Sequence, residues 1–102
     1  LHTAARRMTE AARQHAKTRS AFINRTLKQL ARELLLAQSS DWAFLMKTGT
    51  AVDYATRRTN DHLLRFTRLW EMLESSQPDE GLLAACEERD NLFPNVNWKH
   101  YL

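Results

Sequence analysis

The sequence has few of the residues that end regular secondary structure. Its 102 residues include only two glycines and two prolines, so turns are few and the segments between them are long. A β-sandwich or barrel would need a turn signal roughly every 8–12 residues, and these signals are missing. We therefore predict an all-α fold, a bundle of about four helices followed by an extended C-terminal tail. A chain of this length builds one modest hydrophobic core, so we expect residues 1–102 to form a single domain.

Cysteine and long apolar runs are also scarce. Cys86 is the single cysteine, which excludes a disulfide within the chain. It lies beside Leu82, Leu83 and Ala85, and this setting indicates a buried, unreactive thiol. Such cysteine usage fits a reducing compartment, and we expect a cytoplasmic location. No stretch approaches the ~18 uncharged apolar residues of a membrane helix, so we expect no membrane partner.

The residue patterns of metal and cofactor sites are missing as well. The four histidines His2, His15, His62 and His100 stand singly, without the spacings of three or four residues at which a helix converges metal ligands. There is no glycine-rich loop that could hold a phosphate, because the two glycines are isolated. We predict no metal, no cofactor and no catalytic residues in this chain. His62 falls on an apolar helical stripe, and we predict it to be a hydrogen-bonded core histidine.

Charge is unevenly distributed along the chain. The net charge is +3, but residues 1–33 carry eight lysines and arginines against two glutamates, and the rest of the chain is net acidic. One interpretation is a free-standing helical interaction module whose basic face binds nucleic acid or an acidic partner. The other is that these are solvated helix faces, some of which meet the acidic C-terminal third. The basic third contains just one aromatic residue, Phe22, which disfavours nucleic-acid binding.

Apolar residues recur at helical spacing in four stretches. We predict helices over residues 3–17, from Ala21 to Met46, from Thr50 to a stop at residues 75–78, and over residues 79–89. Ser20 is a candidate N-cap for the second helix. The tail after residue 89 has no usable period, and we predict that it runs extended over the bundle and docks Phe93 and Trp98.

The second helix has a polar interruption within its most apolar part. Leu34-Leu35-Leu36-Ala37 is followed by Gln38, Ser39, Ser40, Asp41 and Trp42, which we call the polar segment, and we expect the helix to continue through it. Sugars are bound by aromatic rings that pack on their C–H patches and by carboxylates that accept from their hydroxyls. Asp41 beside Trp42 supplies both groups. The alternative is that Trp42 is a core indole and that Asp41 caps a helix or pairs with an arginine.

A resemblance to a known family adds weight to the sugar-binding interpretation. Residues 31–44, 47–51, 61–66 and 88–94 resemble the C-terminal helical domain of family 57 glycoside hydrolases, specifically the α-1,4-glucan branching enzymes. The resemblance spans most of the chain. It implies an accessory domain of a larger enzyme that makes α-1,6 branches by retaining glycosyl transfer.

The same resemblance implies where the chemistry of that enzyme lies. The family's catalytic glutamate and aspartate belong to a barrel domain that precedes the helical domain, so the chain would be a catalytically silent fragment beginning just after it. It would contribute one wall of the substrate cleft, with Gln38, Ser39, Ser40, Asp41 and Trp42 as the substrate-binding residues. The implied partners are an α-glucan and the preceding barrel. We expect the isolated fragment to self-associate through its barrel-facing surface.

Overall fold

The structure is a bundle of four α-helices in the part of the chain that it describes. The computed structural model describes the backbone of residues 1–46 and 51–102 and the side chains of residues 1–41 and 56–102. The helices are α1 (His2–Gln14), α2 (Ala21–Met46), α3 (Ala51–Ser75) and α4 (Glu80–Arg89), followed by a short 3-10 helix at Trp98–Tyr101. The predicted all-α class is confirmed. Among the described helices, none has an apolar stretch long enough to cross a lipid bilayer.

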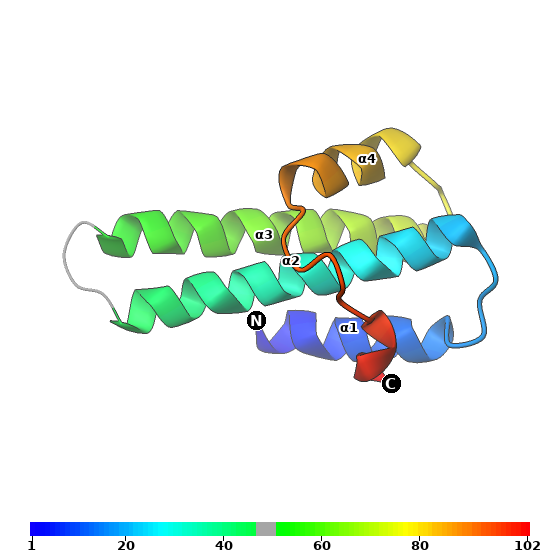
Figure 1. The fold of residues 1–102 in the computed structure, drawn as a ribbon, viewed down its shortest axis with the longest axis horizontal. Helices are drawn as coiled ribbons and strands as arrows, with labels where there is room; N and C mark the ends of the chain where they lie inside the picture. Colours follow the sequence, from blue (N-terminus) through cyan, green and yellow to red (C-terminus); the bar gives the residue numbers. More distant parts are fainter. Residues whose placement is uncertain (47–50) are drawn as a thin grey trace.

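The two long helices form the frame of the molecule. α2 and α3 pack antiparallel along each other, with α1 against one side of the pair and α4 against the other (Figure 1). The tail leaves α4, passes across α2, and brings the 3-10 helix against α1 (Figure 1). The tail therefore joins the two outer layers across the central pair.

α2 is the central element because its apolar residues are buried on more than one side. Ser20 begins it as predicted, since its Oγ accepts a hydrogen bond from the backbone N–H of Ile23 at 3.2 Å. The helix continues without interruption through Ser39 to Met46, which confirms the expected continuity. Its buried apolar side chains are Leu27, Leu30, Ala31, Leu34, Leu36 and Ala37. Small side chains of α1, Ala4, Ala11 and Ala12, let that helix approach the core closely.

The ends of α3 and α4 follow from their local sequence. Ser76, at φ 54°, ends α3 in the left-handed conformation, and the N–H of Gln77 bonds back to the carbonyl of Met72. Asp79 then caps α4, because its carboxylate accepts from the N–H of Leu82 at 2.9 Å. The start of α3 was predicted at Thr50, which lies outside the residues that the structure describes.

Part of the basic N-terminal third pairs with the acidic C-terminal third. The Arg25 guanidinium lies 2.7 Å from a carboxylate oxygen of Glu80 and 2.6 Å from one of Glu87. It thereby links the start of α2 to α4. This confirms that some of the basic residues meet acidic partners within the chain.

The tail confirms one predicted anchor and contradicts the other. Trp98 is buried as predicted, at 5% exposure. The prediction that Phe93 docks on the bundle is wrong, because its side chain is 41% exposed. The cause lies three residues earlier. Asp90 turns into the bundle and is held there, and the backbone at Phe93 adopts φ 58°, so the chain turns before the aromatic ring can pack.

A core truncation tests the packing around α2. Leu34 is fully buried, and Leu34→Ala should lower the free energy of unfolding by about 2–5 kcal/mol because it removes buried methyl groups and leaves a cavity. Leu64→Ala is the matched control, since Leu64 is 50% exposed and its truncation should stay within about 0.5 kcal/mol of zero. Denaturant titration measures both values. Equal losses in the two variants would contradict this core.

Candidate functional site

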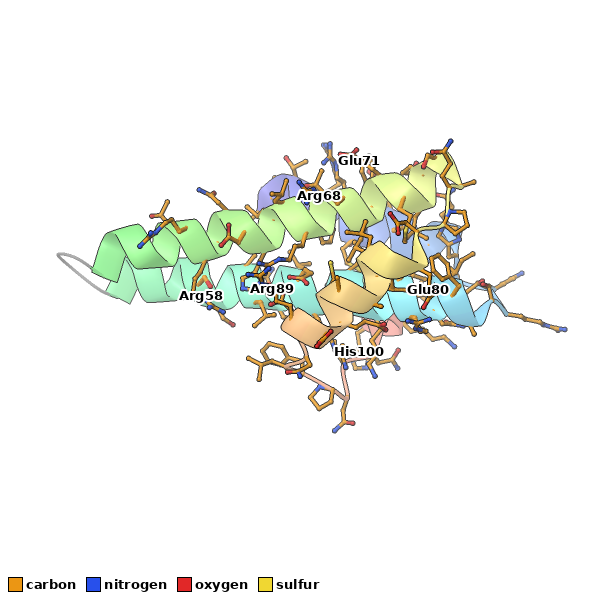
Figure 2. The ribbon with its side chains drawn as sticks, turned by 90° about the horizontal axis from the view of Figure 1, so that it is seen from above. Arg58, Arg68, Glu71, Glu80, Arg89 and His100 are labelled. Carbon is orange, nitrogen blue, oxygen red and sulfur yellow. The ribbon has the colours of Figure 1, made fainter. Side chains whose placement is uncertain are left out.

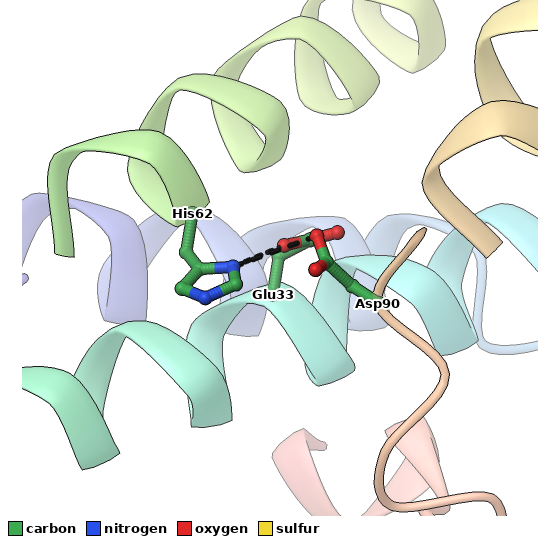
Figure 3. A group of neighbouring side chains, drawn as sticks. All are labelled: Glu33, His62 and Asp90. Atoms are coloured by element: carbon green, nitrogen blue, oxygen red, sulfur yellow. Dashed lines mark hydrogen bonds and ion pairs between the residues drawn. The ribbon is translucent and has the colours of Figure 1, made fainter. Parts of the chain in front are cut away.

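The structure brings three ionisable side chains together inside the bundle. Glu33 of α2, His62 of α3 and Asp90 of the tail are 0%, 2% and 7% exposed, and their side chains converge (Figure 3). Charged groups are seldom buried this deeply unless they are paired. We define the buried polar network as these three residues together with Gln29 and Arg65.

The central contact of the network is a hydrogen bond between His62 and Glu33. His62 Nδ1 lies 2.9 Å from Glu33 Oε1 and 3.5 Å from Asp90 Oδ2. On the other side of the ring, Nε2 lies 3.4 Å from a guanidinium nitrogen of Arg58. A guanidinium can only donate, so Nε2 accepts. The ring proton therefore lies on Nδ1, which donates to Glu33.

Gln29 and two arginines satisfy the remaining polar groups. The Gln29 amide nitrogen donates to Glu33 Oε2 at 3.1 Å and to the backbone carbonyl of Asp90 at 2.9 Å. Its amide oxygen accepts from Arg32 at 3.1 Å. Arg65 lies 2.8 Å from Asp90 Oδ2. The network thus connects α2, α3 and the tail through side chains that are almost all inaccessible to water.

Burial and the neighbouring carboxylate set the protonation of Glu33. Burial raises the pKa of Glu33 from 4.5 to about 7, and the nearby Asp90 adds to this effect, while the hydrogen bonds from His62 and Gln29 oppose it. For Asp90, burial raises the pKa, but the hydrogen bond with Glu33 and the charge of Arg65 outweigh it and lower the pKa below 3.8. The pKa values of the two carboxyl groups therefore move in opposite directions, and Glu33 is the one that takes up a proton.

The network has the ligand types of a metal site but not the surroundings of one. One ligand atom from each of Glu33, His62 and Asp90 can be chosen so that all three lie within 4.8 Å of one another, a convergence that the sequence analysis missed. However, Arg65 already occupies Asp90 Oδ2, and Arg58 faces the second nitrogen of His62. A metal-bound histidine normally donates from that second nitrogen. The side chains of Glu33, His62 and Asp90 therefore suit the binding of a proton and two guanidinium groups better than that of a divalent cation.

The same two carboxyl groups do not form a glycosidase pair. Retaining glycosidases hold two carboxyl groups about 5–5.5 Å apart on either side of the reacting bond. A carboxyl oxygen of Glu33 lies within 4.8 Å of one of Asp90. Both are buried, so no sugar can lie between them.

The predicted substrate-binding residues lie on α2, two turns beyond the network. Gln38 and Ser39 are exposed, whereas Ser40 and Asp41 are half-buried. The side chain of Trp42 lies outside the described residues. Asp41 is eight residues from Glu33, about 12 Å along the helix. The network therefore holds the helix that carries the polar segment.

Asp41 lines a hollow between the two long helices. The hollow has a volume of about 230 Å³ and is also lined by Thr56, Thr59 and Asn60 of α3. These three residues were not predicted as site residues by the sequence analysis. A signal was present, because three polar residues within five positions interrupt the start of a helix that is otherwise strongly apolar on its inner side.

Comparison with known proteins identifies the domain. The family model described as the C-terminal domain of 1,4-alpha-glucan branching enzyme matches residues 1–101. The chain belongs to this family. A 1,4-alpha-glucan branching enzyme of Thermococcus kodakarensis is 46% identical to this branching-enzyme C-terminal domain over 82 residues, which cover 76% of the chain and 12% of the relative.

Two solved structures are also similar to this chain over almost all of its length. The alpha-amylase AmyC of Thermotoga maritima matches with a TM-score of 0.89 and 40% identity, and the GH57-type branching enzyme of Pyrococcus horikoshii with 0.81 and 42%. Each match covers 98% of this chain and 19% of the solved chain. The branching-enzyme C-terminal domain therefore spans less than a fifth of the length of the relatives that it matches.

The raised pKa of Glu33 predicts a pH dependence of stability. A carboxyl group whose pKa is raised on folding contributes stability that is complete below its unfolded pKa and is lost as the pH rises through its folded pKa. For Glu33 this window runs from 4.5 to about 7. Glu33→Gln removes the titrating group, so the variant should lose less stability than the parent across this window. Denaturant titration at a series of pH values measures the slopes.

Glu74→Gln provides the control for this pH experiment. Glu74 is an exposed residue of α3, so its replacement should leave the slope of the parent unchanged. Asp90 does not enter the window, because its pKa is lowered below 3.8. A Glu33→Gln variant with the same slope as the parent would show that Glu33 does not take up a proton on folding.

Proposed function

We propose that this domain is the accessory helical part of a 1,4-α-glucan branching enzyme and forms one wall of its glucan-binding cleft. The polar segment of α2, Gln38, Ser39, Ser40, Asp41 and Trp42, supplies the proposed substrate-binding residues. The α-glucan and the catalytic barrel implied by the family resemblance are the proposed partners. A reducing, cytoplasmic location is part of the proposal and fits the buried Cys86, whose pKa burial raises to about 11.

The observation that carries this proposal is the half-buried position of Asp41 in its hollow. A helix that only packs would place apolar residues there, as α2 does at Leu36 and Ala37. Instead a carboxylate shares the hollow with Thr59, Asn60 and Thr56. Hydroxyl, amide and carboxylate groups on one concave surface match the alternating donors and acceptors of a sugar ring.

Trp42 supplies the apolar half of the proposed site. An indole presents a large rigid face on which the C–H patches of a glucose unit can pack. Trp42 follows Asp41 directly within the uninterrupted α2, so its backbone is about 1.5 Å further along the helix axis than that of Asp41. Excluding water beside the reacting bond would favour transfer to a sugar hydroxyl over hydrolysis.

Neutralising Asp41 tests the polar half of the site. In the full-length enzyme, Asp41→Asn should lower kcat/KM for branching by roughly 10- to 100-fold, because a hydrogen bond to a charged group contributes about 1.5–3 kcal/mol. Glu71→Gln is the control, because Glu71 is exposed and lies towards the opposite end of α3 (Figure 2). Branch formation and the thermal midpoint are measured for both variants. Unchanged kcat/KM in Asp41→Asn would remove Asp41 from the site.

Removing the indole tests the apolar half separately. Trp42→Ala in the full-length enzyme should lower branching well beyond any effect on stability, and should shift the products from branched chains towards hydrolysed ones, since water would reach the reacting bond. The two products are quantified from the same reaction. If turnover and the branching-to-hydrolysis ratio both stay at the parent values, the cleft-wall role of Trp42 is wrong.

A further inference from the structure

The tail presents two neighbouring apolar side chains to solvent. Leu92 is 59% exposed and Phe93 is 41% exposed, although they stand only two and three residues after the buried Asp90. Single exposed apolar residues are common on protein surfaces. Two in succession, one of them aromatic, on a segment that is held in place on both sides are less easily explained by chance. We call this pair the apolar tip of the tail.

The chain is fixed on both sides of the apolar tip. Before it, Asp90 is held through its carboxylate by Arg65 and through its backbone carbonyl by Gln29. After it, Trp98 is buried in the core cluster. The tip is therefore a short span between two buried attachment points, and its direction is set by the bundle.

The backbone at Phe93 is held in an unfavourable conformation. Phe93 has φ 58°, a region that bulky residues seldom adopt because it is sterically strained. Its carbonyl accepts from Arg32 Nε at 3.4 Å and from the N–H of Val96 at 3.1 Å. Such strain persists where the surrounding structure imposes it, and it is concentrated at functional positions. Here it accompanies an aromatic side chain that is left 41% exposed.

We propose that Leu92 and Phe93 anchor this helical domain on the catalytic part of the same branching-enzyme polypeptide, by inserting into an apolar pocket there. The inference rests on the proposed function, because it requires the rest of a branching enzyme. The occupant is indicated by the relatives, in which a domain matching 98% of this chain is only 19% of the solved polypeptide. Most of each relative is thus available to cover the tip.

The chemistry of the pair fits a docking anchor. Aromatic and aliphatic side chains that enter a partner's pocket carry most of the binding energy of many interfaces. An anchor that is already oriented loses little conformational freedom when it docks. The attachments at Asp90 and Trp98 provide that orientation before docking. The strained backbone at Phe93 is then the conformation in which the side chain is ready to dock.

Cysteine labelling of the full-length enzyme tests this anchor. Phe93→Cys is treated with a maleimide under native conditions and again after unfolding in denaturant. If the tip is docked, the native rate should be at least tenfold slower than the unfolded rate. Leu64→Cys calibrates an apolar position of matched exposure, 50%, and the parent protein gives the background. Cys86 adds little to that background under native conditions, since it is buried, and its reaction after unfolding is subtracted with the unfolded parent.

The outcomes separate the anchor from its alternatives. A native rate for Phe93→Cys within twofold of the unfolded rate would overturn the proposal. Protection that disappears on dilution would also overturn it, because it would assign the tip to contact between copies of the protein. Protection that is independent of concentration supports it. The labelling needs no glucan, so it can succeed even if Asp41→Asn leaves branching unchanged and the cleft-wall role fails.

Discussion

The hydrogen bond between Glu33 and His62 is the contact on which the arrangement of this domain depends. It joins the middles of the two long helices inside the bundle, and Gln29 and Arg65 extend it to Asp90 and so to the tail. Buried polar groups are costly unless every donor and acceptor is satisfied, so the network is stable in few arrangements. It therefore defines the axial alignment of α2 with α3 and the point where the tail leaves the bundle. The polar segment of α2 and the apolar tip of the tail both belong to elements that this network holds.

Helical periodicity was sufficient to predict the fold, because burial in this chain follows the apolar stripes closely. Leu27, Leu30 and Leu34 of α2 and Phe66 and Leu69 of α3 are buried as their spacing indicates, and the turn at Pro78 and the cap at Ser20 follow local rules. The tail could not be predicted in this way, since it has no period. Its course is set by Asp90, a residue that sequence reasoning would place in water, and the error at Phe93 follows from that single buried carboxylate.

The candidate site was predictable only in part, for a related reason. An interruption of an apolar helix by Ser39, Ser40 and Asp41 is visible in the sequence, and the structure shows an unbroken helix there with Asp41 in a hollow. The partners of Asp41 on α3 depend on how the two helices are aligned, and no local pattern contains that information. His62 was predicted as a hydrogen-bonded core histidine, and this is confirmed. Its partners Glu33 and Asp90, distant in the chain, were not predicted.

The protonation of the His62 ring tests the central claim most directly, because it depends on the contacts of both ring nitrogens in the parent protein. Arg58 faces Nε2 at 3.4 Å and Glu33 faces Nδ1 at 2.9 Å. Long-range proton–nitrogen NMR correlation of the histidine rings at neutral pH reports which nitrogen carries the proton. The account predicts a slowly exchanging proton on Nδ1 and an unprotonated Nε2. A proton on Nε2, or a ring that exchanges rapidly with solvent, would contradict the network as the constraint that organises this domain.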